Sequence, residues 1–129
     1  MTLSTLNPAL RQALAERNYD ELTPVQSAVL TQEAGSRDVL VSAQTGSGKT
    51  VAYGLAIAAD LLGEAERFEE ADAPLALVIA PTRELAMQVE RELLWLYQKA
   101  GGRIVSCVGG MDPRRERRRL ADGDRKSVV

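Results

Sequence analysis

The sequence predicts an α/β fold in which a parallel sheet carries helices on both faces. Three short runs rich in valine, isoleucine and leucine, at residues 39–42, 75–80 and 104–108, alternate with longer segments whose apolar residues recur at helical spacing. Strands that alternate with helices in this way form parallel sheets joined by right-handed crossovers. A glycine or proline follows each run within a few residues, as expected where a strand gives way to a loop.

The composition is that of one globular domain. The 129 residues are 45% hydrophobic with a net charge of −2, which excludes nucleic-acid binding through overall basic charge but allows a local basic patch. There is no histidine and Cys107 is the only cysteine, so we expect a buried structural thiol and no disulfide or metal cluster. No apolar stretch approaches the ~20 residues of a membrane span, and no signal-peptide pattern is present. These features predict a cytoplasmic protein without a membrane partner.

Two short helices are predicted near the N-terminus. Asn7 and Thr23 are suitable N-caps, and the prolines that follow them, Pro8 and Pro24, fit the first position of a helix. The apolar spacing of the first helix ends near Asn18.

The middle of the chain continues the alternation of strands and helices. The run at 39–42 has no polar alternation, so we expect this strand to be covered on both faces. A helix rich in alanine and leucine follows at 51–62. The acidic segment 64–72 is expected to be a solvated loop without a function. Pro81 then stops the second strand, and Thr82 caps a long helix.

The remaining elements are marked by aromatic residues and glycines. Trp95 and Tyr97 lie near the end of the long helix and are expected to pack against other elements rather than to stack on bases. Gly101 and Gly102 end that helix, the third strand follows, and a short helix is expected to start at Asp112.

The motif at residues 43–50 is the most informative. It reads Ala-Gln-Thr-Gly-Ser-Gly-Lys-Thr between an apolar run and a helical pattern, which is the context of a phosphate-binding loop. Gly46 and Gly48 let the backbone curl so that successive N–H groups point at phosphate oxygens. Lys49 would reach the β- and γ-phosphates, and the Thr50 hydroxyl would ligate Mg²⁺. The strict pattern has glycine at the first position, so an ordinary glycine-rich turn is the alternative.

Three motifs follow the three expected strands. The phosphate loop comes after the first, Pro-Thr-Arg-Glu-Leu at 81–85 after the second, and Gly109-Gly110 after the third. Ligands of open parallel sheets bind beyond the carboxyl ends of the strands. We therefore expect one shared binding surface at that edge, although each motif alone is compatible with an ordinary loop.

These motifs closely resemble those of the N-terminal RecA-like domain of DEAD-box ATP-dependent RNA helicases, and more loosely those of other superfamily 2 helicases. Residues 43–50 are similar to motif I, whose usual first residue is alanine, and residues 22–26, Leu-Thr-Pro-Val-Gln, to the Q motif. The resemblance implies ATP with Mg²⁺, and Gln26 paired with the adenine edge, which an amide can match by donating and accepting. Of these residues, Lys49 and Thr50 are implied to be catalytic, and Thr50 to ligate the metal. The implied nucleotide-binding residues are Tyr19, Glu21, Gln26, Ala43, Gln44, Thr45, Gly46, Ser47, Gly48, Lys49 and Thr50.

The resemblance also implies RNA as a partner. Residues 81–86 are similar to motif Ia and Gly109-Gly110 to the GG motif, both of which contact the RNA backbone in the family. The implied RNA-binding residues are Pro81, Thr82, Arg83, Glu84, Gly109 and Gly110. A threonine hydroxyl, the N–H groups of the following helix and the Arg83 guanidinium are suited to sequence-independent phosphate contacts. An intramolecular ion pair between Arg83 and Glu84 is the alternative.

Several features depart from the family pattern. Asn18-Tyr19 stands where Gly-aromatic is usual, and no upstream aromatic is present to stack on adenine, Leu3 being the nearest candidate. The chain contains no Asp-Glu-Ala-Asp, Thr-Pro-Gly-Arg or Ser-Ala-Thr and no second RecA-like domain. The acid that would position water and the arginine finger, worth about 10³ or more in rate, are therefore missing.

The resemblance divides the chain into three parts and stops near residue 123. We expect a Q-motif helical region at 1–34, a partial RecA-like ATP-binding domain at 35–123, and a non-native tail at 124–129. The hexapeptide Asp-Arg-Lys-Ser-Val-Val is what a common sequencing-adapter DNA would encode, so our hypothesis is that the tail is an artefact, and a natural short C-terminus is the alternative. We also expect the isolated chain to be marginally folded, because strand edges and apolar faces would be uncovered.

The sequence is thus interpreted as an ATP-binding fragment of an RNA helicase whose intact parent couples ATP hydrolysis to RNA unwinding. The fragment itself is expected to be a poor enzyme. Another P-loop nucleoside triphosphatase, such as a DNA helicase, and a non-catalytic nucleotide-binding remnant are the alternatives. The arginine-rich run at 114–119 is either a solvated helix face or a non-specific RNA contact.

Overall fold

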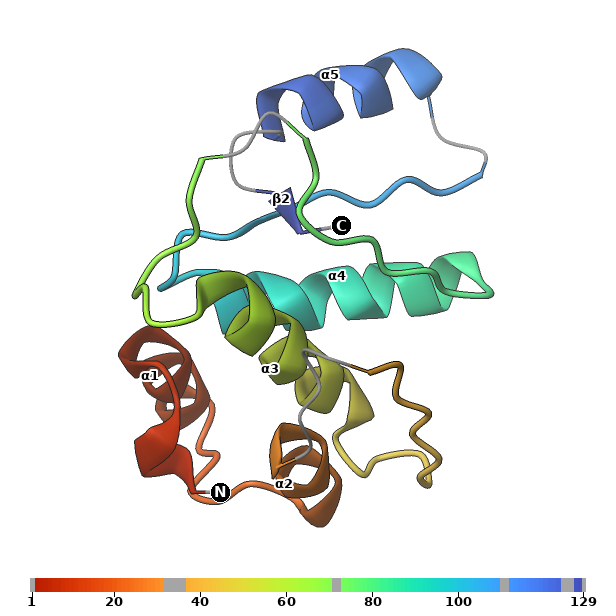
Figure 1. Ribbon diagram of the computed structural model, residues 1–129. Helices are drawn as coiled ribbons and strands as arrows, with labels where there is room; N and C mark the ends of the chain where they lie inside the picture. Colours follow the sequence, from red (N-terminus) through yellow and green to blue (C-terminus); the bar gives the residue numbers. More distant parts are fainter. Residues whose placement is uncertain (1, 32–36, 71–72, 110–111, 124–126, 129) are drawn as a thin grey trace.

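The computed structural model of the chain describes residues 2–31, 37–70, 73–109, 112–123 and 127–128 (Figure 1). The elements in chain order are the 3-10 helix η1 (Leu3–Thr5), α1 (Pro8–Glu16), α2 (Pro24–Thr31), α3 (Lys49–Leu62), α4 (Arg83–Tyr97), β1 (Arg103–Ile104), α5 (Pro113–Gly123) and β2 (Ser127–Val128). Helices α1 to α4 lie on one side of the segments around β1 and β2, and α5 lies on the other side (Figure 1).

The helix starts that the sequence predicts are confirmed. The Asn7 side chain accepts a hydrogen bond from the Ala9 N–H at 2.9 Å, and Pro8 is the first residue of α1. Thr82 caps α4 in the same way, by accepting from the Leu85 N–H at 3.2 Å. These caps satisfy backbone donors that have no partner within the first turn.

Helix α1 ends at a residue in the left-handed conformation. Asn18 has a φ of 60°. The Asn18 N–H donates to the Ala15 carbonyl and the Tyr19 N–H donates to the Leu14 carbonyl, both at 3.0 Å, which is a Schellman arrangement. Glycine is the usual residue at this position and asparagine tolerates it best among the others. Asn18 can therefore take the place of the family's glycine without a change in backbone path.

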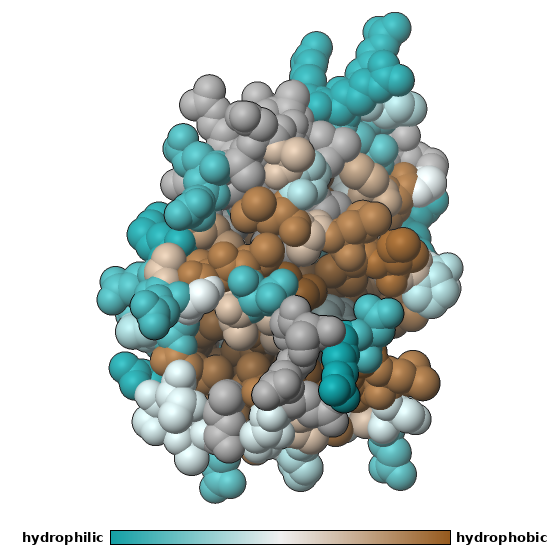
Figure 2. Space-filling model, viewed as in Figure 1, coloured by the Kyte–Doolittle hydropathy of each residue, from teal (hydrophilic) through white to brown (hydrophobic). Residues whose placement is uncertain are grey.

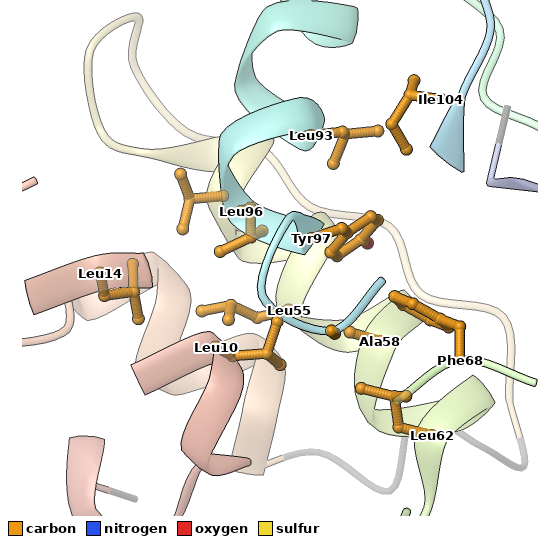
Figure 3. Close-up of a cluster of buried hydrophobic side chains, with 12 residues drawn as sticks. Leu10, Leu14, Leu55, Ala58, Leu62, Phe68, Leu93, Leu96, Tyr97 and Ile104 are labelled. Carbon is orange, nitrogen blue, oxygen red and sulfur yellow. The ribbon is translucent and has the colours of Figure 1, made fainter. Parts of the chain in front are cut away.

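The hydrophobic core is built from α1, α3 and α4 (Figure 3). Leu10 and Leu14 of α1 point toward Leu55 of α3, and Leu96 of α4 closes the cluster (Figure 3). The core extends to Phe68, whose ring meets Tyr97 edge-on with centroids 5.2 Å apart. Phe68 is buried although the described residues around it, 64–67 and 69–70, are exposed and non-helical, so the expectation of a solvated loop is confirmed there except at Phe68. Residues 71 and 72 of this segment lie outside the described residues.

Helices α3 and α4 are in close contact at Gly54. A Cβ atom added to Gly54 would lie 2.8 Å from the Leu96 Cδ2 atom and 2.9 Å from the Leu93 Cδ2 atom. The buried Tyr97 hydroxyl donates to the Gly54 carbonyl. The two helices are thus held together by packing and by a hydrogen bond at the same residue.

The sheet is smaller than the sequence predicts. β1 and β2 pair in parallel, with Arg103 opposite Ser127 and Ile104 opposite Val128. The third expected strand is therefore confirmed only at Ile104. The expected strands at 39–42 and 75–80 form no ladder with the segments that the structure describes, apart from one bridge residue, so these two predictions were wrong.

Apolar side chains of the two unpaired segments face solvent. Leu40 is 97% exposed, Leu77 72% and Ile79 84%, and Figure 2 shows a band of hydrophobic surface across the middle of one face. The expectation that 39–42 is covered on both faces was wrong. These residues have the strand composition, but a strand is stabilised by hydrogen-bonded neighbours and by packing on its faces. Among the described residues 39–42 has no ladder partner, and 75–80 has a single bridge and packs on the core only through alternate residues such as Ala76 and Val78.

Two further expectations concern single side chains. Cys107 is exposed, so the prediction of a buried thiol was wrong, because the segment that follows β1 is covered on one side only. Tyr97 is fully buried, and Trp95 stacks with Tyr19 at a centroid distance of 5.9 Å. The prediction that both aromatic residues of α4 pack against other elements is confirmed.

Candidate functional site

The loop before α3 has the backbone of a phosphate-binding loop. Gly46 and Gly48 have φ angles of 82° and 81°, which residues with a Cβ atom rarely adopt. The two glycines have different surroundings. No atom lies within 4 Å of a Cβ added at Gly46, whereas one added at Gly48 would lie 2.5 Å from the Gln26 Nε2 atom. Gly46 therefore borders open space, and Gly48 allows α2 to approach the loop.

The side chain of Gln26 supports the phosphate-binding loop through a hydrogen bond. Its side chain is fully buried, the Oε1 atom accepts from the Thr23 N–H at 3.0 Å, and the Nε2 atom donates to the Gly48 carbonyl at 3.3 Å. The Thr23 hydroxyl donates to the Ser47 carbonyl at 2.9 Å. An amide has a second N–H and a second lone pair, but because the side chain is fully buried a ligand could reach them only after a local rearrangement. Sequence reasoning assigned Gln26 to adenine and did not foresee this support of the loop.

Three side chains of the loop are placed for anion binding. The Lys49 ammonium group donates to the Ala43 carbonyl, so the side chain bridges the two ends of the loop. Thr50 follows in the first turn of α3 and is partly buried. The Ser47 hydroxyl is buried and has no hydrogen-bond partner among the described residues. Buried polar groups normally have a partner, and a phosphate oxygen would supply one here. The loop therefore fits a nucleotide phosphate.

The remaining candidates for the adenine pocket are not gathered at the loop. Tyr19 packs on Trp95 of α4, and the Arg17 guanidinium lies 5.1 Å from the centre of the Trp95 ring. Glu21 is exposed. Of the three residues outside the loop, the structure brings only Gln26 into hydrogen-bond contact with it.

The candidate RNA-binding residues that the structure describes gather at the start of α4, beside Gly109. The Arg83 side chain, at the first residue of α4, donates to the Gly109 carbonyl, and a groove at this point is lined by Pro81, Thr82 and Val108 among others. Arg83 forms no ion pair with Glu84 among the described residues. Pro81 and Glu84 are exposed beside the groove. Gly110 lies outside the described residues.

The start of α4 has donors suited to phosphate. The Thr82 oxygen accepts from the Leu85 N–H, which leaves its own O–H free to donate. The first N–H groups of α4 have no partner within the helix, and the helix dipole makes this end positive. The expectation that the three motifs share one surface is thus supported by the contact of Arg83 with Gly109. It is also supported by a pocket that Lys49 and Thr50 line together with Pro81 and Leu85.

Two observations concern metal sites and membrane-spanning helices. In the part of the chain that the structure describes, no group of three or more metal-binding side chains could hold a metal ion. The described helices are all too short or too polar to cross a membrane.

Comparisons with known sequences agree on one family. The model of the DEAD/DEAH box helicase family matches residues 23–129. The ATP-dependent RNA helicase MAK5 of Coccidioides immitis is 35% identical over 131 residues, with 92% of this chain and 17% of the relative covered. The ATP-dependent RNA helicase RhlB of Haemophilus influenzae is 39% identical over 105 residues, with 81% and 25% covered. The chain thus spans a quarter or less of the length of these relatives.

Solved structures give the same result for the fold. The RNA helicase Prp28 of Chaetomium thermophilum, determined with bound ADP, aligns with a TM-score of 0.78 and 36% identity, and 97% of this chain and 30% of that chain are covered. An ATP-dependent RNA helicase of Sulfolobus tokodaii, described as hypothetical, aligns with a TM-score of 0.75 and 29% identity, with 96% and 34% covered. These likenesses confirm the predicted fold class, an α/β RecA-like fold present in part.

Proposed function

Because this chain belongs to the DEAD/DEAH box helicase family, we propose that it is the ATP-binding and RNA-binding part of an ATP-dependent RNA helicase that acts in the cytoplasm. In this proposal residues 1–34 form the Q-motif region and residues 35–123 the nucleotide-binding part of a RecA-like domain. The observation that carries the proposal is the buried Ser47 hydroxyl, which has no hydrogen-bond partner among the described residues, in a loop shaped by two left-handed glycines.

The chain's own residues bind and orient the nucleotide. The loop N–H groups and the Ser47 hydroxyl donate hydrogen bonds to phosphate oxygens. When the nucleotide binds, the Lys49 ammonium group gives up its hydrogen bond to the Ala43 carbonyl and binds the β- and γ-phosphates instead. Thr50 would hold Mg²⁺, which when bound neutralises phosphate charge. On the resemblance to the Q motif, Gln26 would offer its remaining N–H and lone pair to adenine once the base displaces what now covers the side chain, and Tyr19 and Glu21 would complete that pocket.

The groove at the start of α4 is proposed to hold the RNA backbone. Pro81, Thr82, Arg83 and Gly109 line this groove. The exposed Glu84, and Gly110 outside the described residues, are included in the proposal on the resemblance of their motifs alone. Contacts to phosphates alone make binding independent of sequence, as unwinding of arbitrary duplexes requires. In the intact parent, ATP binding and hydrolysis would drive local opening of the duplex. The 129 residues contain no Asp-Glu-Ala-Asp, so we propose that alone they bind ATP without rapid hydrolysis.

The first test is ATP binding, measured by titration calorimetry on the chain and on its Lys49→Ala variant. Affinity should fall about tenfold or more, because a hydrogen bond to a charged group contributes about 1.5–3 kcal/mol and 1.4 kcal/mol is a factor of ten. Lys99→Ala is the matched control, since Lys99 forms a surface ion pair with Glu16 on α1. Equal affinity of the Lys49→Ala variant and the parent chain would refute the nucleotide site.

A second measurement separates the RNA helicase from the DNA helicase alternative. Single-stranded RNA and DNA of the same length are titrated into the chain with ATP and Mg²⁺ present. Preference for RNA, reduced by Arg83→Gln, is expected. Preference for DNA would favour the alternative class.

A further inference from the structure

The basic residues of this acidic chain are unevenly distributed. Five of its 16 lysines and arginines fall within the six positions 114–119, in the first two turns of α5. The side chains of Arg114, Arg115, Arg117 and Arg118 are exposed. Figure 2 shows long hydrophilic side chains that project at the top of the molecule, where Figure 1 places α5.

The orientation of this helix is fixed by Glu116. Its carboxylate accepts from the Val108 N–H at 3.1 Å, and the Asp112 side chain caps the helix by accepting from the Arg114 N–H at 2.9 Å. Glu116 is two residues from both Arg114 and Arg118, which at about 100° per residue puts it on the opposite side of the helix. Arg114 and Arg118 therefore lie opposite Glu116, and Arg115 and Arg117 flank it about 100° to either side. Together these four exposed side chains form a broad basic face, the arginine face (Arg114, Arg115, Arg117 and Arg118).

The charge pattern of the arginine face opposes the stability of the helix itself. Arg114 and Arg118 are four residues apart, a spacing at which like charges repel. Arg114 and Arg115 also lie in the first turn, where the helix dipole favours acidic residues. A solvated face usually mixes charges of both signs, as the exposed residues Glu84 and Arg91 do on α4. A polyanion bound along the arginine face would offset both the repulsion between the arginines and their unfavourable interaction with the helix dipole.

The start of α5, where the arginine face begins, lies next to the proposed RNA groove. Val108, whose N–H binds Glu116, lines that groove, and the next residue, Gly109, accepts from Arg83. An RNA strand that leaves the groove beside Gly109 therefore meets the first turn of α5. We propose that the arginine face is a second phosphate-binding surface that extends the RNA track beyond the groove; this inference rests on the proposed RNA binding.

The test measures RNA affinity by fluorescence anisotropy over a range of salt concentrations, with the full chain and labelled oligouridines of two lengths. The short probe spans only the groove, and the long probe also reaches α5. For single strands each phosphate contact contributes about 0.7 to the slope of log affinity against log salt, so Arg114→Gln/Arg118→Gln should lower the slope for the long probe by about 1.4. The short probe should bind this variant as it binds the parent chain.

Two matched variants separate charge from folding and position. Arg11→Gln/Arg91→Gln removes the same charge from exposed sites on α1 and α4 and should leave the slope unchanged. Arg114→Lys/Arg118→Lys keeps the charge and should retain the parent slope. The inference would be overturned if the salt slope for the long probe fell as much in Arg11→Gln/Arg91→Gln as in Arg114→Gln/Arg118→Gln. It would also be overturned if the slope fell as much in the lysine variant as in the glutamine variant of α5.

Other outcomes distinguish this inference from the function on which it rests. One outcome is that Arg83→Gln weakens binding of both probes while Arg114→Gln/Arg118→Gln binds the long probe as the parent chain does. The proposal for the arginine face would then be refuted, and the proposed RNA groove would be supported. If the parent chain binds neither probe, both proposals fail. If the α5 variant loses affinity only for an oligoglutamate peptide, the face docks an acidic protein and the inference is overturned.

Discussion

Tyr97 is the single side chain on which the contact between α3 and α4 most depends. Its ring is fully buried, and its hydroxyl donates to the Gly54 carbonyl. Burial raises the pKa of Tyr97 above its ordinary value of 10.0, and the nearby Tyr53 adds to the shift. A raised pKa in the folded chain means that stability is complete below the unfolded pKa and is lost as the pH rises above it.

We therefore expect the free energy of unfolding to fall steeply above pH 10 in urea titrations followed by circular dichroism. The contribution of one buried phenol is at most about 1.4 kcal/mol for each pH unit. Tyr97→Phe should lose about 1 kcal/mol at neutral pH through the missing hydrogen bond and should show a shallower alkaline slope. Tyr19→Phe, in a partly exposed ring, is the control for removal of a hydroxyl and should lose less stability at neutral pH than Tyr97→Phe. A Tyr97→Phe chain with an unchanged slope would contradict the assignment.

Individual residues also show what sequence reasoning could and could not predict. The caps Asn7 and Thr82 were predictable because a cap acts within its own turn. The left-handed conformation of Asn18 has a local signal too, since asparagine is the usual substitute for glycine there. The contact of Gln26 with Gly48 joins residues far apart in the chain, and no local pattern indicates which hydrogen bonds a buried amide makes.

At the scale of elements, the α3–α4 contact gives a test at Gly54. Alanine is favoured over glycine in a helix by about 0.5–1 kcal/mol, so Gly54→Ala would stabilise an unpacked helix. Here the added Cβ would meet Leu93 and Leu96 below 3 Å, and both leucines are buried and cannot move aside freely. We expect a net loss of about 1–3 kcal/mol from overpacking.

The measurement is again urea unfolding, with Gly54→Ala/Leu96→Val as the matched variant. The smaller valine makes room for the new methyl group, so the loss in the double variant should be smaller than the sum of the single losses. A Gly54→Ala chain more stable than the parent would show that the helices do not approach as closely as the structure indicates.

The strand predictions failed at the same scale for a different reason. Residues 39–42 and 75–80 have strand composition, but a strand is defined by its partner, and the described segments form no ladder with them beyond one bridge at Ala76. Helices α1, α3 and α4 could be predicted from sequence because their hydrogen bonds are internal. The extent of a sheet depends on residues distant in the chain and was therefore beyond local reasoning.

For the whole molecule, the exposed apolar band is the feature that governs behaviour in solution. Leu77 and Ile79 are more than two thirds exposed, and unpaired apolar segments associate with other chains. We expect the isolated chain to self-associate, and Leu77→Lys/Ile79→Lys to raise the monomeric fraction in sedimentation velocity while helical circular dichroism is retained. Leu93→Lys is the contrasting variant, because Leu93 is buried and a charge there should unfold the chain. Loss of helical signal in the double lysine variant would mean that these side chains are part of the packed core.

The contact at Gly54 has a further consequence, for the energetic relation between two ligands. Lys49 is the first residue of α3 and Arg83 the first residue of α4, so the two helices that meet without spare room at Gly54 each begin at a proposed binding place. A ligand that displaces one helix must displace the other or compress the leucines between them. If a nucleotide changes the affinity for RNA by this route, thermodynamic linkage requires RNA to change the affinity for the nucleotide by the same factor.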